Sequence, residues 1–150
     1  MSVGLDEILG ELYHSQKFFR AHLNGIRREQ WDWKPFPACR SIREILIHWA
    51  DSFSAEDTAL RSALEPTTPN VAVVQKLMKE AGLRYGARYH QQYEDATMDS
   101  LCSNGTAVGT VLASLSAEDN YHAGQVAFIR LATDLKWDWV KAVHQTPEGL

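Results

Sequence analysis

The sequence predicts an all-α protein, an antiparallel four-helix bundle built as a single domain over residues 1–150. Two observations lead to this fold class. Apolar residues recur at helical spacing in four long segments, and no segment shows the strict alternation that is typical of a half-buried strand. The connections between these segments are short, which favours antiparallel packing of the helices. With 150 residues, 45% of them hydrophobic, the chain is long enough to bury one core without disulfides.

The first two helices are predicted at about residues 5–26 and 42–64. In the first, one face carries Leu5, Ile8, Leu12, Phe19, Leu23 and Ile26. Pro35 and Pro37 then interrupt the pattern, and we expect this tryptophan-rich stretch to be an ordered loop that packs on the bundle. Ser41 and Glu44 form an S-x-x-E capping box at the start of the second helix. Its apolar face consists of Ile42, Ile45, Leu46, Trp49 and Phe53.

The third and fourth helices are predicted at about residues 71–89 and 108–135. The third has Gly82 and Gly86 in its interior, and because glycine is a poor helix former we expect this helix to fray or bend there. Trp137 and Trp139 follow the fourth helix. They are too apolar for a free tail, so we expect them to fold back on the bundle or to cover a subunit contact.

Charge and composition exclude several classes of partner. The net charge is -4 and no run of Lys and Arg exceeds a pair, so neither nucleic acid nor an anionic membrane is expected as a partner. No apolar run reaches the roughly 20 residues that a membrane span needs, and the N-terminal residues lack the pattern of a signal peptide, so we expect a cytoplasmic protein. Cys39 and Cys102 are expected to be reduced, inert thiols. Apolar residues off the main stripes, such as Phe18 and Phe128, favour a homodimer.

The fourth helix carries polar residues where its apolar face is expected. On a helical wheel Glu118, Asp119 and His122 lie on or within about 20° of an arc of apolar residues. Buried carboxylates need partners, because an isolated charge in a core costs several kcal/mol. Glu118 and His122 are spaced i, i+4, so their side chains share one face and could hold one ion.

A third ligand has to come from another helix, and His48 is the best candidate among the six histidines. It lies on the shoulder of the apolar stripe of the second helix, about 60° from Ile45. Two imidazoles and one carboxylate suit Zn, Fe, Ni or Mn when a position stays open for water or substrate. The alternative is a buried hydrogen bond between Glu118 and His122 that holds no ion.

Two stretches, "RSIREILIHWAD" and the later "EDNYHAGQVAFIR", resemble the DinB-like superfamily, specifically the YfiT-like group of metal-dependent four-helix bundles. The most specific piece is "YHAGQV". The resemblance implies that three histidines bind a divalent metal, with His48 as the ligand from the second helix and His122 as the last ligand. Glu118 stands where the family has its middle histidine. Activities found in the family are transfer of a low-molecular-weight thiol to a small electrophilic substrate and amide hydrolysis.

The glutamate can be interpreted in two ways. Glu118 could serve as an oxygen ligand and make bound water less acidic than an all-histidine site does. Alternatively the metal is lost, and the protein is a non-catalytic module that binds a small molecule or a partner. Asp119 is a candidate base or an acceptor behind the ligands, and Tyr121 or Gln125 could orient the imidazole of His122.

Overall fold

The computed structural model describes residues 4–53, 58–92 and 97–145, and it is all-α as predicted. Within these residues the only extended pairings are isolated bridges, Gly4 with Thr97 and Leu101 with Ala107. No helix in the described ranges combines the length and the apolar character that a membrane span requires. The helical elements are α1 (Leu5–Ala21), η1 (Arg28–Gln30), α2 (Ile42–Phe53), α3 (Thr58–Ala63), α4 (Val71–Gln92), α5 (Val108–Thr133) and η2 (Val140–His144).

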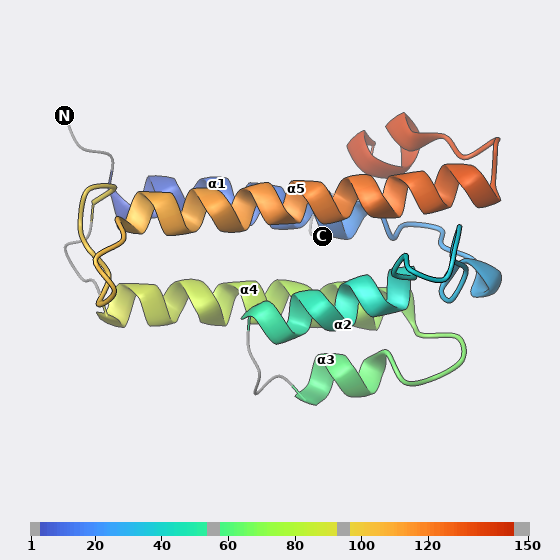
Figure 1. The fold of residues 1–150 in the computed structure, drawn as a ribbon, viewed down its shortest axis with the longest axis horizontal. Coiled ribbons are helices and arrows are strands. Elements are labelled where there is room, and N and C mark those ends of the chain that lie inside the picture. The colour runs from blue at the N-terminus through green and yellow to red at the C-terminus, as the bar shows by residue number, and fades with distance from the viewer. Residues whose placement is uncertain (1–3, 54–57, 93–96, 146–150) are drawn as a thin grey trace.

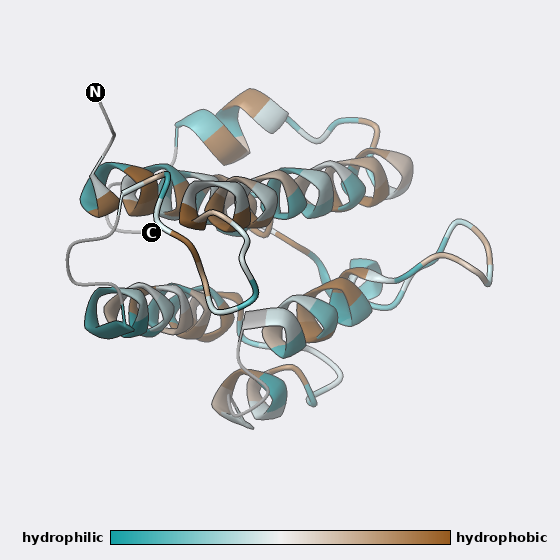
Figure 2. Ribbon diagram, turned by 60° about the vertical axis from the view of Figure 1, so that its left-hand side comes forward, coloured by the Kyte–Doolittle hydropathy of each residue, from teal (hydrophilic) through white to brown (hydrophobic). Residues whose placement is uncertain are grey.

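The long helices lie in two layers (Figure 1). α1 and α5 run side by side in the same direction and form one layer, whereas α2 and α4 run in the opposite direction and form the other. The short helix α3 runs back below α2, which returns the chain to the end where α4 begins. Each helix carries both hydrophobic and hydrophilic residues (Figure 2), as expected for helices that cover a shared core with one face.

Two predictions about the helices are wrong. The single helix predicted at about 42–64 is two helices, α2 and α3, which run in opposite directions. α4 continues through Gly82 and Gly86 to Gln92 instead of fraying. Its glycines are sites of close approach to α1, because a Cβ atom at Gly82 would collide with Gln16 and one at Gly86 with Tyr13.

The capping box at the start of α2 is confirmed. The backbone N–H of Ser41 donates to Glu44 Oε2 at 2.8 Å, and the backbone N–H of Glu44 donates to Ser41 Oγ at 3.2 Å. Each side chain thereby satisfies a backbone donor that lacks a partner within the helix. The loop before the cap is anchored by Trp31, which is fully buried, as expected of a loop that packs on the bundle.

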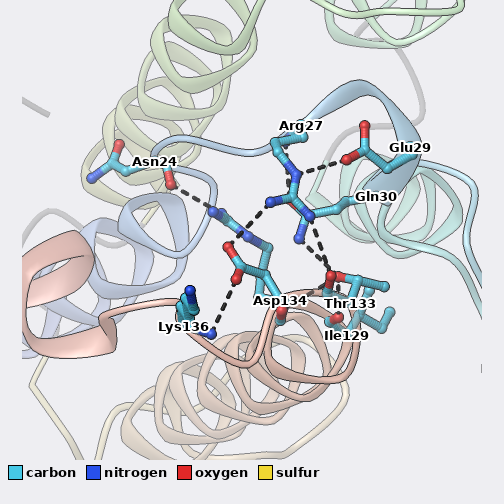
Figure 3. Close-up of polar contacts among 9 residues, drawn as sticks. Asn24, Arg27, Glu29, Gln30, Ile129, Thr133, Asp134 and Lys136 are labelled. Atoms are coloured by element: carbon cyan, nitrogen blue, oxygen red, sulfur yellow. Dashed lines mark hydrogen bonds and ion pairs between the residues drawn. The ribbon is translucent and has the colours of Figure 1, made fainter.

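The end of α5 is tied to the loop that follows α1 (Figure 3). Arg27 donates to Asp134 Oδ2 at 3.2 Å and to the carbonyl oxygen of Thr133, and Gln30 donates to Thr133 Oγ1 at 2.7 Å. Arg130, which is buried, donates to the carbonyl oxygens of His22 and Asn24. These bonds fix α5 along its axis relative to α1.

The chain after α5 folds back on α1, one of the two outcomes expected for its tryptophans. Trp139 Nε1 donates to His22 Nε2 at 2.9 Å, and the guanidinium carbon of Arg130 lies 4.8 Å from the ring centroid of Trp137. Phe18 packs against Trp139, with ring centroids 6.4 Å apart. Phe18 is therefore partly covered within the monomer, whereas Phe128 is 58% exposed.

Candidate functional site

His48 of α2 and His122 of α5 meet between the two layers. Their ring centroids are 5.5 Å apart and the rings are nearly perpendicular, at 81°. His122 is buried, with 4% of its surface exposed, while His48 is half-buried. The structure therefore brings together the two histidines that the sequence singled out, from segments more than seventy residues apart.

The ring of His122 is held by its own helix. Nδ1 lies 2.8 Å from Gln125 Oε1, and Gln125 Nε2 donates to the hydroxyl oxygen of Tyr121 at 3.3 Å. Because an amide oxygen only accepts, Nδ1 carries the proton, and in the neutral ring Nε2 keeps its lone pair. Burial lowers the pKa of His122 below 6.5, although the hydrogen bond with Gln125 opposes the change, and the positive charge of Arg40 adds to the effect of burial. The neutral ring is thus favoured near pH 7.

Asp119 links three helices directly beside this pair. It is fully buried, and its carboxylate accepts a hydrogen bond from Trp49 Nε1 at 2.8 Å and one from Ser15 Oγ at 3.1 Å. Burial raises the pKa of Asp119 to about 6, although these two hydrogen bonds oppose the change. Trp49 follows His48 in the sequence, so the bond from α2 to α5 fixes the relative position of the two histidines. The use of Asp119 as a base stays a prediction.

Glu118 does not share the buried face, so the helical wheel was wrong for this residue. Its side chain is exposed, whereas those of Asp119 and His122 are buried. The wheel placed Glu118 within about 20° of the apolar arc, and a margin of that size does not separate the buried stripe from its exposed edge. Among residues 4–53, 58–92 and 97–145, no group of three or more His, Cys, Asp and Glu side chains is assembled to hold a metal. Glu118 as a ligand stays a prediction.

The other histidines lie elsewhere. His14 is exposed on α1, and His90 Nε2 lies 2.9 Å from Asp6 Oδ1 at the surface. His22 is buried and holds the C-terminal segment, since its Nδ1 lies 2.8 Å from the carbonyl oxygen of Phe18 while Nε2 accepts from Trp139. His144 packs against that same tryptophan, with ring centroids 4.7 Å apart.

A pocket of about 820 Å³ lies next to residues that contact His122, although neither His48 nor His122 is among its lining residues. It lies between the loop before α2 and the outward face of α5, and Tyr121 and Gln125, which hold or contact His122, are among its walls. A Cβ atom added at Gly124 would meet nothing within 4 Å, so this glycine opens the wall. The lining residues are Pro35, Ala38, Cys39, Arg40, Asn120, Tyr121, Gly124, Gln125, Phe128 and Ile129.

Sequence reasoning missed the buried contact of Ser15 and Trp49 with Asp119, and it missed Arg40 at the pocket. The contact with Asp119 could have been predicted in part, because a buried indole N–H needs an acceptor and a buried carboxylate needs donors. No sequence pattern indicates a role for Arg40, because its place in the pocket depends on the path of the loop before α2. Trp31 and Trp49 are core residues.

Comparison of the chain with family models, with curated proteins and with solved structures finds no match. The resemblance to the DinB-like superfamily stays a prediction.

Proposed function

We propose that His48 and His122, together with Glu118, bind one divalent metal ion, and that the protein is a metal-dependent enzyme of the DinB-like type with an antiparallel four-helix-bundle fold. Its reaction is transfer of a low-molecular-weight thiol to a small electrophile, or hydrolysis. The observation that carries the proposal is the distance of 5.5 Å between the two imidazole centroids. Rings that bind one tetrahedral ion through nitrogens at about 2.0–2.1 Å have centroids about 5.2 Å apart.

The residues present fit a metal in their chemistry. A metal-bound histidine commonly uses its second nitrogen to donate a hydrogen bond, which orients the ring. Gln125 accepts such a bond from Nδ1 of His122, so Nε2 remains for a metal. The pKa of His122 is lowered, which supports the neutral state that binding requires. Glu118 lies one helical turn before His122 and forms no hydrogen bond or ion pair with another described residue.

The protein side of the mechanism is mainly orientation. Gln125 holds the ring of His122, and the bond from Trp49 to Asp119 holds α2 and α5 together at the level of both histidines. A bound divalent metal lowers the pKa of a coordinated thiol or water and so supplies a nucleophile near pH 7. In this proposal the electrophile would occupy the pocket walled by Tyr121 and Gln125, the two residues that contact or hold His122. The expected metals are Zn, Ni, Fe or Mn, since imidazole and carboxylate ligands suit all four.

A second candidate is a non-catalytic module that binds a small molecule or a partner protein. Exposure of Glu118 and the lack of an assembled three-ligand group among the described residues favour it. In that case His48 and His122 are a polar contact between helices. The homodimer stays a proposal, with the exposed Phe128 as its surface evidence.

Thiol-transfer and hydrolysis assays after reconstitution with each metal test the two candidates. We expect metal-dependent turnover of some electrophile with a thiol cosubstrate, lost in His48→Gln and in His122→Gln but kept in the control His14→Gln, which changes an exposed histidine of α1. Equal turnover with and without metal, or in His122→Gln, would contradict the enzyme and favour the binding module.

A further inference from the structure

Among the described residues, the pocket between the loop before α2 and the outward face of α5 has one charged side chain in its wall, the guanidinium of Arg40. No acidic residue in the described part of the chain lines it, although the chain as a whole has a net charge of -4. An isolated positive charge at the edge of a concave, otherwise uncharged wall attracts an anion. The pocket thereby differs from two other pockets on the molecule, which have Glu11 in their walls.

Arg40 is available, in contrast to its basic neighbours on the same loop and the start of α2. Lys34 lies 2.8 Å from Glu44, and Arg43 lies 2.7 Å from Asp32 and also donates to backbone carbonyl oxygens. Arg40 forms no hydrogen bond or ion pair with any residue that the structure describes. Its planar guanidinium offers two parallel N–H donors, an arrangement that matches a carboxylate.

The rest of the wall suits a flat apolar body. Tyr121 and Phe128 lie seven residues apart on α5, so they project from the same face, and they are 64% and 58% exposed. Gly124 lies between them, and the space above it is open to at least 4 Å. Two exposed aromatic side chains that flank an open stretch of helix provide surfaces for contact with another aromatic ring. A volume of about 820 Å³ lies within the range of small-molecule sites.

We propose that this pocket binds a small aromatic carboxylate, with the carboxylate paired to Arg40 and the ring between Tyr121 and Phe128. The proposal rests on the proposed function in one respect, because it treats the pocket as the substrate side of the histidine pair. Asn120 and Gln125 supply neutral polar groups in the same wall. Binding itself needs only these side chains and takes place without a metal.

Fluorescence titration with 2-naphthoate, in buffer that contains a chelator, tests the proposal, with 2-naphthamide as the uncharged analogue. We expect saturable binding of 2-naphthoate, at least about tenfold weaker in Arg40→Gln, as for loss of a hydrogen bond to a charged group. The control Arg28→Gln removes the same charge at an exposed position outside the pocket and should leave the affinity unchanged. Equal affinities for acid and amide, or for Arg40→Gln and the parent protein, would overturn the proposal.

A second readout locates the ligand. Cys39 lines the pocket and Cys102 does not, and both are half-buried free thiols. Saturating 2-naphthoate should slow alkylation of Cys39 by N-ethylmaleimide and leave the rate at Cys102 unchanged. Equal effects on both thiols, or none on Cys39, would overturn this location. Binding that persists in a protein that takes up no metal would remove the proposed metal site and keep this inference. Metal uptake without 2-naphthoate binding would remove this inference and keep the proposed metal site.

Discussion

Replacing Asp119 by asparagine should make the protein more stable at neutral pH and not at acidic pH. Asparagine keeps both hydrogen bonds, because its amide oxygen accepts from Trp49 and its amide nitrogen donates to Ser15 Oγ. What it removes is a buried charge. The carboxylate is fully buried, and the pKa of Asp119 is raised from 3.8 to about 6.

The size and the sign follow from proton linkage. Between about pH 4 and pH 6 the folded protein keeps the proton on Asp119 whereas the unfolded chain has released it, so the free energy of unfolding falls as the pH rises. A pKa raised from 3.8 to about 6 corresponds to a loss of about 3 kcal/mol, complete above pH 6. The asparagine side chain in Asp119→Asn does not ionise, so this variant keeps its stability as the pH rises. Its free energy of unfolding should exceed that of the parent protein by up to about 3 kcal/mol near pH 8.

Urea unfolding followed by tryptophan fluorescence, at several pH values and with chelator present, measures this difference. The advantage of Asp119→Asn should shrink steadily below about pH 6 and be gone near pH 4. Asp99→Asn, an exposed position, makes the same change in charge without the burial and should show no such gain. A difference between Asp119→Asn and the parent protein that stays constant across this pH range would refute the reasoning.

Three further outcomes are expected. Gly86→Ala should destabilise the protein by about 1–3 kcal/mol in thermal unfolding, because the new Cβ collides with the ring of Tyr13; an unchanged Tm would contradict this. Gly124→Ala, with nothing within 4 Å, should instead stabilise by up to about 1 kcal/mol, and a loss of stability there would show that the space is filled. Burial lowers the pKa of His22 below 6.5. The stability that the neutral ring contributes is therefore complete above pH 6.5, and it is lost as the pH falls through the lower pKa of His22 in the folded protein. Acid should then release Trp139, because a protonated ring accepts no hydrogen bond, and the fluorescence change should be absent in Trp139→Phe.

Periodicity predicted the long helices well, since each buries one continuous apolar face, but it could not predict the division of residues 42–64. Helical spacing persists on both sides of the break, and the break depends on how α3 turns back along α2. Gly82 and Gly86 illustrate the same limit. Propensity treats them as weak points, whereas in the folded chain they admit the side chains of Gln16 and Tyr13 from α1.

At the candidate site the sequence predicted the pairing of His48 with His122, because both lie on or near the buried stripes of their helices. It could not predict the direction of Glu118, since a small rotation of α5 decides which edge of the stripe faces water. The sequence could not predict the pocket either. Arg40 lines the pocket together with residues of α5 that follow it by eighty or more positions, and no local pattern predicts such a long-range arrangement.

The most direct test of the metal site is elemental mass spectrometry of tag-free protein purified without added metal or chelator, beside His122→Gln and the control His14→Gln. We expect close to one divalent ion per chain in the parent protein and in His14→Gln, and little metal in His122→Gln. Metal absent from all three, with none taken up on titration, would contradict the site that His48, Glu118 and His122 are proposed to form.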